Sequence, residues 1–81
     1  MKIFIRDSKN NIKTILINES VQTLELKEEI RNKMGIKGDI ELVFNGLVLE
    51  DNDYLIDLDI KEGNTIDYQG HFDAGLKNQF K

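Results

Sequence analysis

The sequence predicts an α+β roll, in which one main helix packs across a mixed β-sheet of about five strands. Short segments that alternate apolar and polar residues recur along the chain, as is typical of half-buried strands. One segment instead carries apolar residues at helical spacing and has a recognisable start and stop. The length of 81 residues leaves room for a single hydrophobic core, so all these elements must share it.

Residues 1–17 are predicted to form a β-hairpin. Ile3 and Ile5 fall on one face of the first strand, because successive side chains of a strand point to opposite faces. The polar cluster at residues 7–11 favours a turn, and the β-branched run at residues 14–17 resumes a strand.

Thr23 is the predicted N-cap of the main helix, because its hydroxyl suits that position. Leu26, Ile30 and Met34 recur every four residues and would lie on one face. Gly35 stands where a glycine in the left-handed conformation ends many helices. Because both ends are marked, this helix is the most clearly specified element.

The second half of the chain predicts three further strands. Residues 40–44 alternate, and the Asn45-Gly46 pair, typical of tight hairpin turns, leads to residues 47–49. Residues 50–63 are acidic and irregular, and residues 65–68 alternate again as a last strand.

The predicted core takes one apolar face from each element, and these residues are Ile3, Ile5, Ile15, Ile17, Leu26, Ile30, Leu42, Phe44, Leu49, Leu55, Ile60, Ile66 and Tyr68. Residues 70–81 show no periodicity and are predicted to be a flexible tail.

Composition excludes several classes of function. The absence of Cys rules out disulfides, thiolate metal sites and cysteine nucleophiles. Residues 37–81 carry four Lys/Arg against ten Asp/Glu, which argues against binding to nucleic acid or an anionic membrane. No apolar run is long enough to span a bilayer. We therefore expect a small intracellular protein that binds other proteins.

Four segments, in order, resemble ubiquitin. Residues 1–6 resemble its opening strand, and residues 23–36 resemble its helix and helix stop. Residues 42–51 resemble its central strand–turn–strand unit, and residues 58–66 resemble its final loop and strand. Residues 65–67 also resemble the SUMO branch of the superfamily. The ordered set is a stronger indication than any one of the motifs.

The resemblance covers about residues 1–69 and implies the ubiquitin-like β-grasp fold, with residues 70–81 as a tail. Conjugated members of the family end in Gly-Gly, which this chain lacks, as it lacks the arginine that ubiquitin offers to its activating enzyme. Some modifiers are trimmed to a single exposed glycine, so Gly75 is a candidate conjugation end. A linker glycine is the more ordinary interpretation.

The resemblance also implies a partner-binding surface on the open face of the sheet. Val43 stands at the position of ubiquitin's central patch isoleucine, and Gly46 at the neighbouring glycine. Asp67 and Gln69 are polar replacements at other patch positions. Leu47 replaces a chain-building lysine and would add apolar surface beside the patch.

Phe4 points outward in the predicted first strand and is a second candidate contact. The alternative is that this face binds no partner, and that Val43 is merely a β-branched residue on a solvated strand face, which is common.

Catalytic and metal chemistry find little support. Carboxylates between residues 51 and 62 follow the spacing of a calcium loop, but Leu55 and Ile56 stand where that loop needs a ligand and a glycine. His71 lies near Asp73 without a nucleophile or an oxyanion site. We expect no catalytic residue, no metal and no cofactor.

The resemblance thus implies a non-enzymatic monomer of the cytoplasm or nucleus that docks to ubiquitin-system or proteasomal receptors. The alternative is a covalent modifier, trimmed after Gly75 and joined to substrate lysines. A sulfur carrier of the same fold would need the terminal Gly-Gly that is missing.

Overall fold

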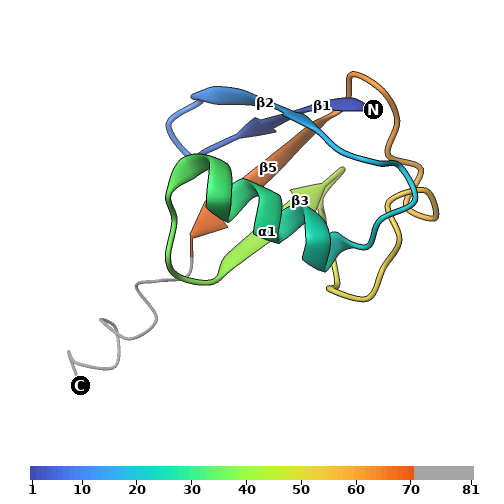
Figure 1. Ribbon diagram of the computed structural model, residues 1–81. Coiled ribbons are helices and arrows are strands. Elements are labelled where there is room, and N and C mark those ends of the chain that lie inside the picture. Colours follow the sequence, from blue (N-terminus) through green and yellow to red (C-terminus); the bar gives the residue numbers. More distant parts are fainter. Residues whose placement is uncertain (71–81) are drawn as a thin grey trace.

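The structure, a computed structural model, describes residues 1–70 of the chain. Its elements, in chain order, are β1 (Lys2–Arg6), β2 (Ile12–Leu16), α1 (Thr23–Met34), β3 (Ile40–Phe44), β4 (Leu47–Val48) and β5 (Thr65–Gly70). The strands form one sheet in the order β2-β1-β5-β3-β4, and α1 crosses one face of it (Figure 1). This arrangement confirms the predicted α+β roll.

The first and last strands lie side by side in the middle of the sheet. β1 and β5 run parallel, with Ile5 opposite Ile66. A parallel pair needs a crossover connection, and the chain between these two strands includes α1. The remaining pairs are antiparallel: β2 flanks β1 on one side, and β3 and β4 continue the sheet beyond β5.

Two glycines stand where the sequence predicts the chain to turn sharply. Gly35 has φ +68°, and the backbone N–H of Ile36 donates to the Arg31 carbonyl at 2.9 Å, which ends α1. Asn45 and Gly46 have φ values of 53° and 80°, as the tight turn between β3 and β4 requires. Both local predictions are confirmed. Each could be made from the sequence because glycine adopts these left-handed backbone conformations far more readily than other residues.

The N-cap of α1 is Gln22, and the prediction of Thr23 at this position is wrong. The backbone N–H of Gln22 donates to the Glu25 carboxylate at 3.1 Å. Thr23 is fully buried, and both its N–H and its hydroxyl donate to the Asp53 carbonyl, at 2.8 and 3.1 Å. This contact draws Thr23 into the interior, so its hydroxyl serves a distant segment instead of the helix end.

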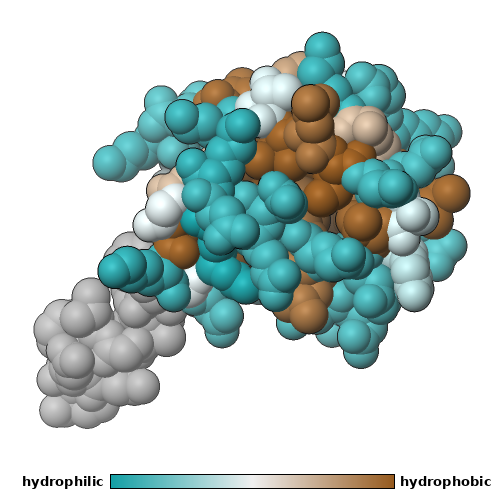
Figure 2. Space-filling view, viewed as in Figure 1, coloured by the Kyte–Doolittle hydropathy of each residue, from teal (hydrophilic) through white to brown (hydrophobic). Residues whose placement is uncertain are grey.

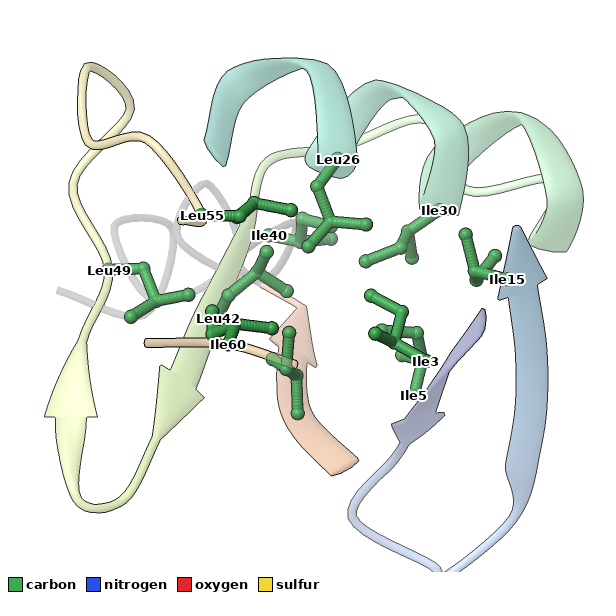
Figure 3. Close-up of a cluster of buried hydrophobic side chains, with 11 residues drawn as sticks. Ile3, Ile5, Ile15, Leu26, Ile30, Ile40, Leu42, Leu49, Leu55 and Ile60 are labelled. Carbon is green, nitrogen blue, oxygen red and sulfur yellow. The ribbon is translucent and has the colours of Figure 1, made fainter. Parts of the chain in front are cut away.

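The core lies between α1 and the sheet (Figure 3), and its buried residues are Ile3, Ile5, Ile15, Leu26, Ile30, Ile40, Leu42, Leu49, Leu55, Ile60 and Ile66. All of them except Ile40 are in the predicted set. Figure 2 shows further apolar surface on the side of α1 that faces β2, whereas the outer side of the helix is hydrophilic.

Three residues predicted for the core are only half-buried: Ile17, Phe44 and Tyr68 pack against its margin. Ile17 follows the outer strand β2, and Phe44 is the last residue of β3, so neighbouring elements cover them on fewer sides. Tyr68 has a large ring whose hydroxyl favours contact with water.

The bounds of three strands differ from the prediction: β2 covers residues 12–16 instead of 14–17, β4 ends one residue early at Val48, and β5 extends beyond residue 68. The N–H of Asp7 donates to the Asn11 carbonyl at 3.0 Å, which closes the turn early, so β2 begins at Ile12. β5 continues to Gly70, which the prediction gave to the tail, and residues 71–81 lie outside the described residues. Within residues 1–70, no helix is long and apolar enough to cross a membrane.

Candidate protein-binding surface

The face of the sheet away from α1, here called the open face, carries one continuous row of paired residues. Across the five strands the register aligns Ile12, Arg6, Asp67, Val43 and Val48. Residues paired across neighbouring strands share a face and contact each other. The row therefore has a charged pair at its centre and apolar residues at both ends.

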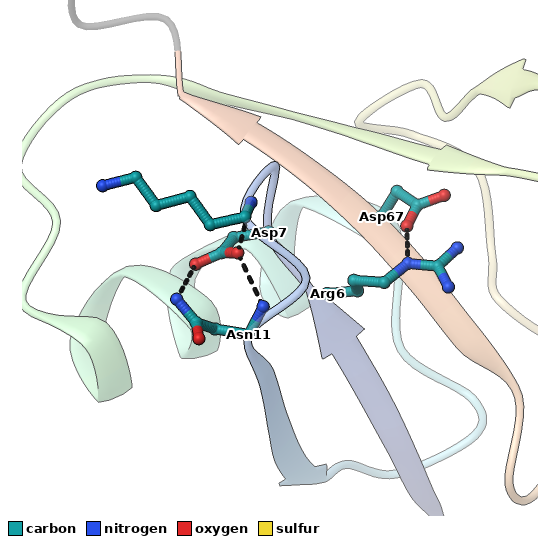
Figure 4. A network of polar contacts seen from close by, with 5 residues as sticks. Arg6, Asp7, Asn11 and Asp67 are labelled. Atoms are coloured by element: carbon teal, nitrogen blue, oxygen red, sulfur yellow. Dashed lines mark hydrogen bonds and ion pairs between the residues drawn. The ribbon is translucent and has the colours of Figure 1, made fainter.

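The charged centre of the row is an ion pair between the first and last strands. Arg6 Nε donates to Asp67 Oδ1 at 2.6 Å (Figure 4). This hydrogen bond raises the pKa of the Arg6 guanidinium above its ordinary value, so the side chain stays charged. Both side chains are more than two-fifths exposed, so solvent screens the pair and its main effect is to fix where the two charges stand.

The apolar end of the row next to β5 is a valine pair. Val43 is half-buried and lies directly opposite Val48, which is 52% exposed. Leu47 is 66% exposed but pairs with Phe44 instead, so the register does not place it beside Val43. Val48 is not among the residues predicted for this surface. The signal for it was present, because a buried Leu49 implies that its neighbour faces the other way.

The other residues predicted for this surface are more scattered. Phe4 is half-buried on β1, and Lys2 Nζ lies 5.9 Å from its ring centroid. Gly46 is exposed in the turn after β3, and Gln69 is exposed on β5. Gly75 lies outside the described residues. Phe4 therefore shares the open face but is separated from the valine pair by β5.

An open hollow of about 1050 Å³ lies beside the row. Its lining includes residues of β1, β3 and β5 together with the loop that joins β1 to β2. A partner side chain that contacts the valine pair would find space here next to polar groups. The residues that flank or line this space on the open face form the open-face site: Arg6, Val43, Val48, Asp67 and Gln69.

The loop that lines the hollow is held by one carboxylate. Asp7 Oδ1 accepts hydrogen bonds from the backbone N–H groups of Asn11 at 2.9 Å and Lys9 at 2.8 Å (Figure 4). Asp7 Oδ2 accepts a further bond from the Asn11 side chain at 3.2 Å. These hydrogen bonds hold the pKa of the Asp7 carboxyl below its ordinary value, and the bond from the Asn11 backbone has the largest effect. The wall of the hollow is therefore preorganised.

The acidic segment after β4 is used for internal contacts. Lys27 Nζ lies 2.7 Å from Asp51 Oδ1, which ties α1 to this segment. Asp53 Oδ2 accepts a bond from the Glu50 N–H at 3.2 Å. In residues 1–70, no three Asp, Glu or His side chains converge as metal ligands would. The open-face site offers apolar contact, an ion pair and an amide.

The comparison with protein families agrees with this architecture. A family model described as "Ubiquitin-2 like Rad60 SUMO-like" matches residues 1–69, which span every element from β1 into β5. No curated protein shows a significant match to the chain. The match extends over most of the chain and agrees with the single helix crossing a mixed sheet. The chain is therefore a member of the Rad60 SUMO-like family of ubiquitin-like domains and has their β-grasp fold.

Proposed function

We propose that this chain is a non-enzymatic docking domain that binds receptors of the ubiquitin system or the proteasome through the open-face site. The observation that carries the proposal is the pairing of Val43 with the exposed Val48 beside the hollow. A small apolar patch with a polar rim is the usual form of a surface that binds another protein. Receptors of this class imply that the chain works in the cytoplasm or the nucleus.

The ion pair next to the patch would help to bind a partner in one defined orientation. Arg6 and Asp67 are held at 2.6 Å and remain exposed, so they present a fixed positive and negative charge to a partner. Charges at the rim of an interface contribute more to orientation and partner choice than to affinity. Because the apolar patch is small, we expect a transient complex and not a permanent one.

The test uses the isotope-labelled chain titrated with isolated ubiquitin-receptor domains and proteasomal receptor subunits. We expect binding to shift the amide resonances of Val43, Val48 and Gln69. Val43→Glu places a carboxylate opposite Asp67 and should weaken binding at least about tenfold, the loss typical of a central interface residue.

The matched control is Ile56→Glu, the same kind of substitution at a residue that is 59% exposed and lies outside the open-face site. It should leave the affinity unchanged. If Val43→Glu binds every receptor as well as the unsubstituted chain does, the open face is not the docking surface.

A covalent modifier trimmed after Gly75 is the competing function, and its support is the small Ala74-Gly75 pair in the sequence. The intact mass of N-terminally tagged chain, recovered from its source cells under denaturing conditions, separates the two. A species ending at Gly75, with adducts on substrate lysines, would establish the modifier. Chain that ends at Lys81 without adducts favours the docking domain.

A further inference from the structure

The outer strand β2 has a free edge that is unusually apolar. No described strand pairs with its outer side. Leu16 is 75% exposed and Ile12 is 56% exposed, and Lys13 is the only charged residue of the strand. Outer strands are normally kept short, or protected by several charges, a proline or a bulge. The opposite edge of the sheet follows this rule, because β4 has only two residues, whereas β2 has five.

Hydrogen bonds at the two ends of the β1–β2 ladder show which backbone groups point to the free edge. Met1 and Ile17 exchange both of their backbone bonds at 2.9 Å, and the Asp7 N–H donates to Asn11 at 3.0 Å. Hydrogen-bonded pairs alternate with unbonded ones in an antiparallel ladder, so the odd-numbered residues of β2 bond to β1. The residues whose N–H and C=O groups point to the free edge are Ile12, Thr14 and Leu16.

We propose that this edge pairs with the same edge of a second copy of the chain, antiparallel and centred on Thr14. In that register Thr14 faces its own counterpart, and Ile12 faces Leu16 of the second copy. Each outward N–H then meets a carbonyl of the second copy, because the three residues that bond outward in one copy lie opposite the same three residues of the other. The two most exposed apolar side chains of the strand cover each other, and Thr–Thr pairs are favourable across strands.

The charge pattern of the strand also fits a second copy. A twofold interface uses the same patch on both partners, so the patch must complement itself. In the centred register Lys13 faces Ile15 of the second copy, and no like charges lie directly opposite each other. No acidic residue lies in β2, although the whole chain carries a net charge of −4. The negative charge that makes two copies repel each other therefore lies outside β2.

The pairing would join two sheets into one and place both open faces on the same side. Residues paired across strands share a face, so Ile12 and Leu16 of the second copy extend the same open face. A five-residue strand pair buries little surface, so the dimer is expected to be weak and the chain monomeric when dilute.

Sedimentation equilibrium of the complete chain tests the proposal. From about 10 μM to about 1 mM, the range of weak complexes, the average mass should rise from 9.4 kDa towards twice that value. Amide resonances of Ile12, Thr14 and Leu16 should shift with concentration, while those of Val43 and Gln69 should not.

Two substitutions and one control make the result specific. Thr14→Pro removes an N–H that bonds nothing in β1, and proline is tolerated at such a position of an outer strand. Leu16→Lys tests the same edge without a backbone change. Each should raise the dissociation constant at least about tenfold, whereas Ile56→Lys, at an exposed isoleucine outside β2, should not.

Three outcomes would overturn the proposal: a mass that stays at 9.4 kDa at every concentration, association that Leu16→Lys leaves intact, or concentration-dependent shifts that map to Val43. If the mass stays constant, the occupant that remains for the free edge of β2 is an extended segment of a different protein.

Discussion

The face of the sheet that α1 covers and the open face are built from the same strands, yet their side chains differ in how completely they are buried. On the covered face, residues such as Ile5 and Leu42 have no exposure at all. On the open face, Val43 and Asp67 stay partly exposed, and neither is enclosed by other side chains. The covered face therefore provides the close packing of the fold, while the side chains of the open face remain accessible to solvent.

The strongest destabilisation is expected on the covered face. Ile30 is fully buried at the centre of the contact between α1 and the sheet (Figure 3). Ile30→Ala should lower the free energy of unfolding by about 2–5 kcal/mol, because it removes apolar contacts and leaves a cavity. Urea denaturation of both proteins measures the difference. The control is Leu24→Ala on the same helix, where the side chain is 42% exposed and the loss should be far smaller.

A smaller effect is expected on the open face. Val43→Ala should cost less than about 1 kcal/mol in the free energy of unfolding, because the side chain is only half-buried. The same denaturation experiment applies. A loss as large as that of Ile30→Ala would instead show that the open face also carries the stability of the fold.

The smallest effect concerns the loop beside the open face and depends on pH. Because the pKa of Asp7 is lowered in the folded chain, its carboxylate stabilises the fold above the unfolded pKa, and this contribution is lost as the pH falls through the folded value. Asp7→Asn should therefore be less stable than the unsubstituted chain near neutral pH. The difference should shrink below about pH 4, near the ordinary pKa of an aspartate. A difference that stays constant through this range would assign the effect to geometry instead of charge.

The features that the sequence predicted are those with local causes. Helix α1, its end at Gly35 and the turn at Asn45 and Gly46 each depend on a few adjacent residues, and each is confirmed. The N-cap at Thr23 was predicted wrongly because that choice depends on a contact with Asp53, thirty residues away.

The open-face site shows the same limit more strongly. The ion pair of Arg6 and Asp67 joins residues 61 positions apart, and it exists only because β1 and β5 pair in one particular register. The pairing of Val48 with Val43 likewise depends on the register of the β3–β4 hairpin. Periodicity assigns a residue to a face of its strand, but it does not assign its neighbours on the next strand.

The central position of β5 has a consequence for how the chain folds during synthesis. The hairpin of β1 and β2 and the hairpin of β3 and β4 are both translated before β5, and neither pairs with the other directly. Until residues 65–70 have left the ribosome, no strand joins the two hairpins, and isolated two-stranded pairs are marginal in water. The last strand then inserts between them and bonds to both. The five-stranded sheet can therefore be completed only once β5 is available, and Arg6 has no Asp67 beside it before then.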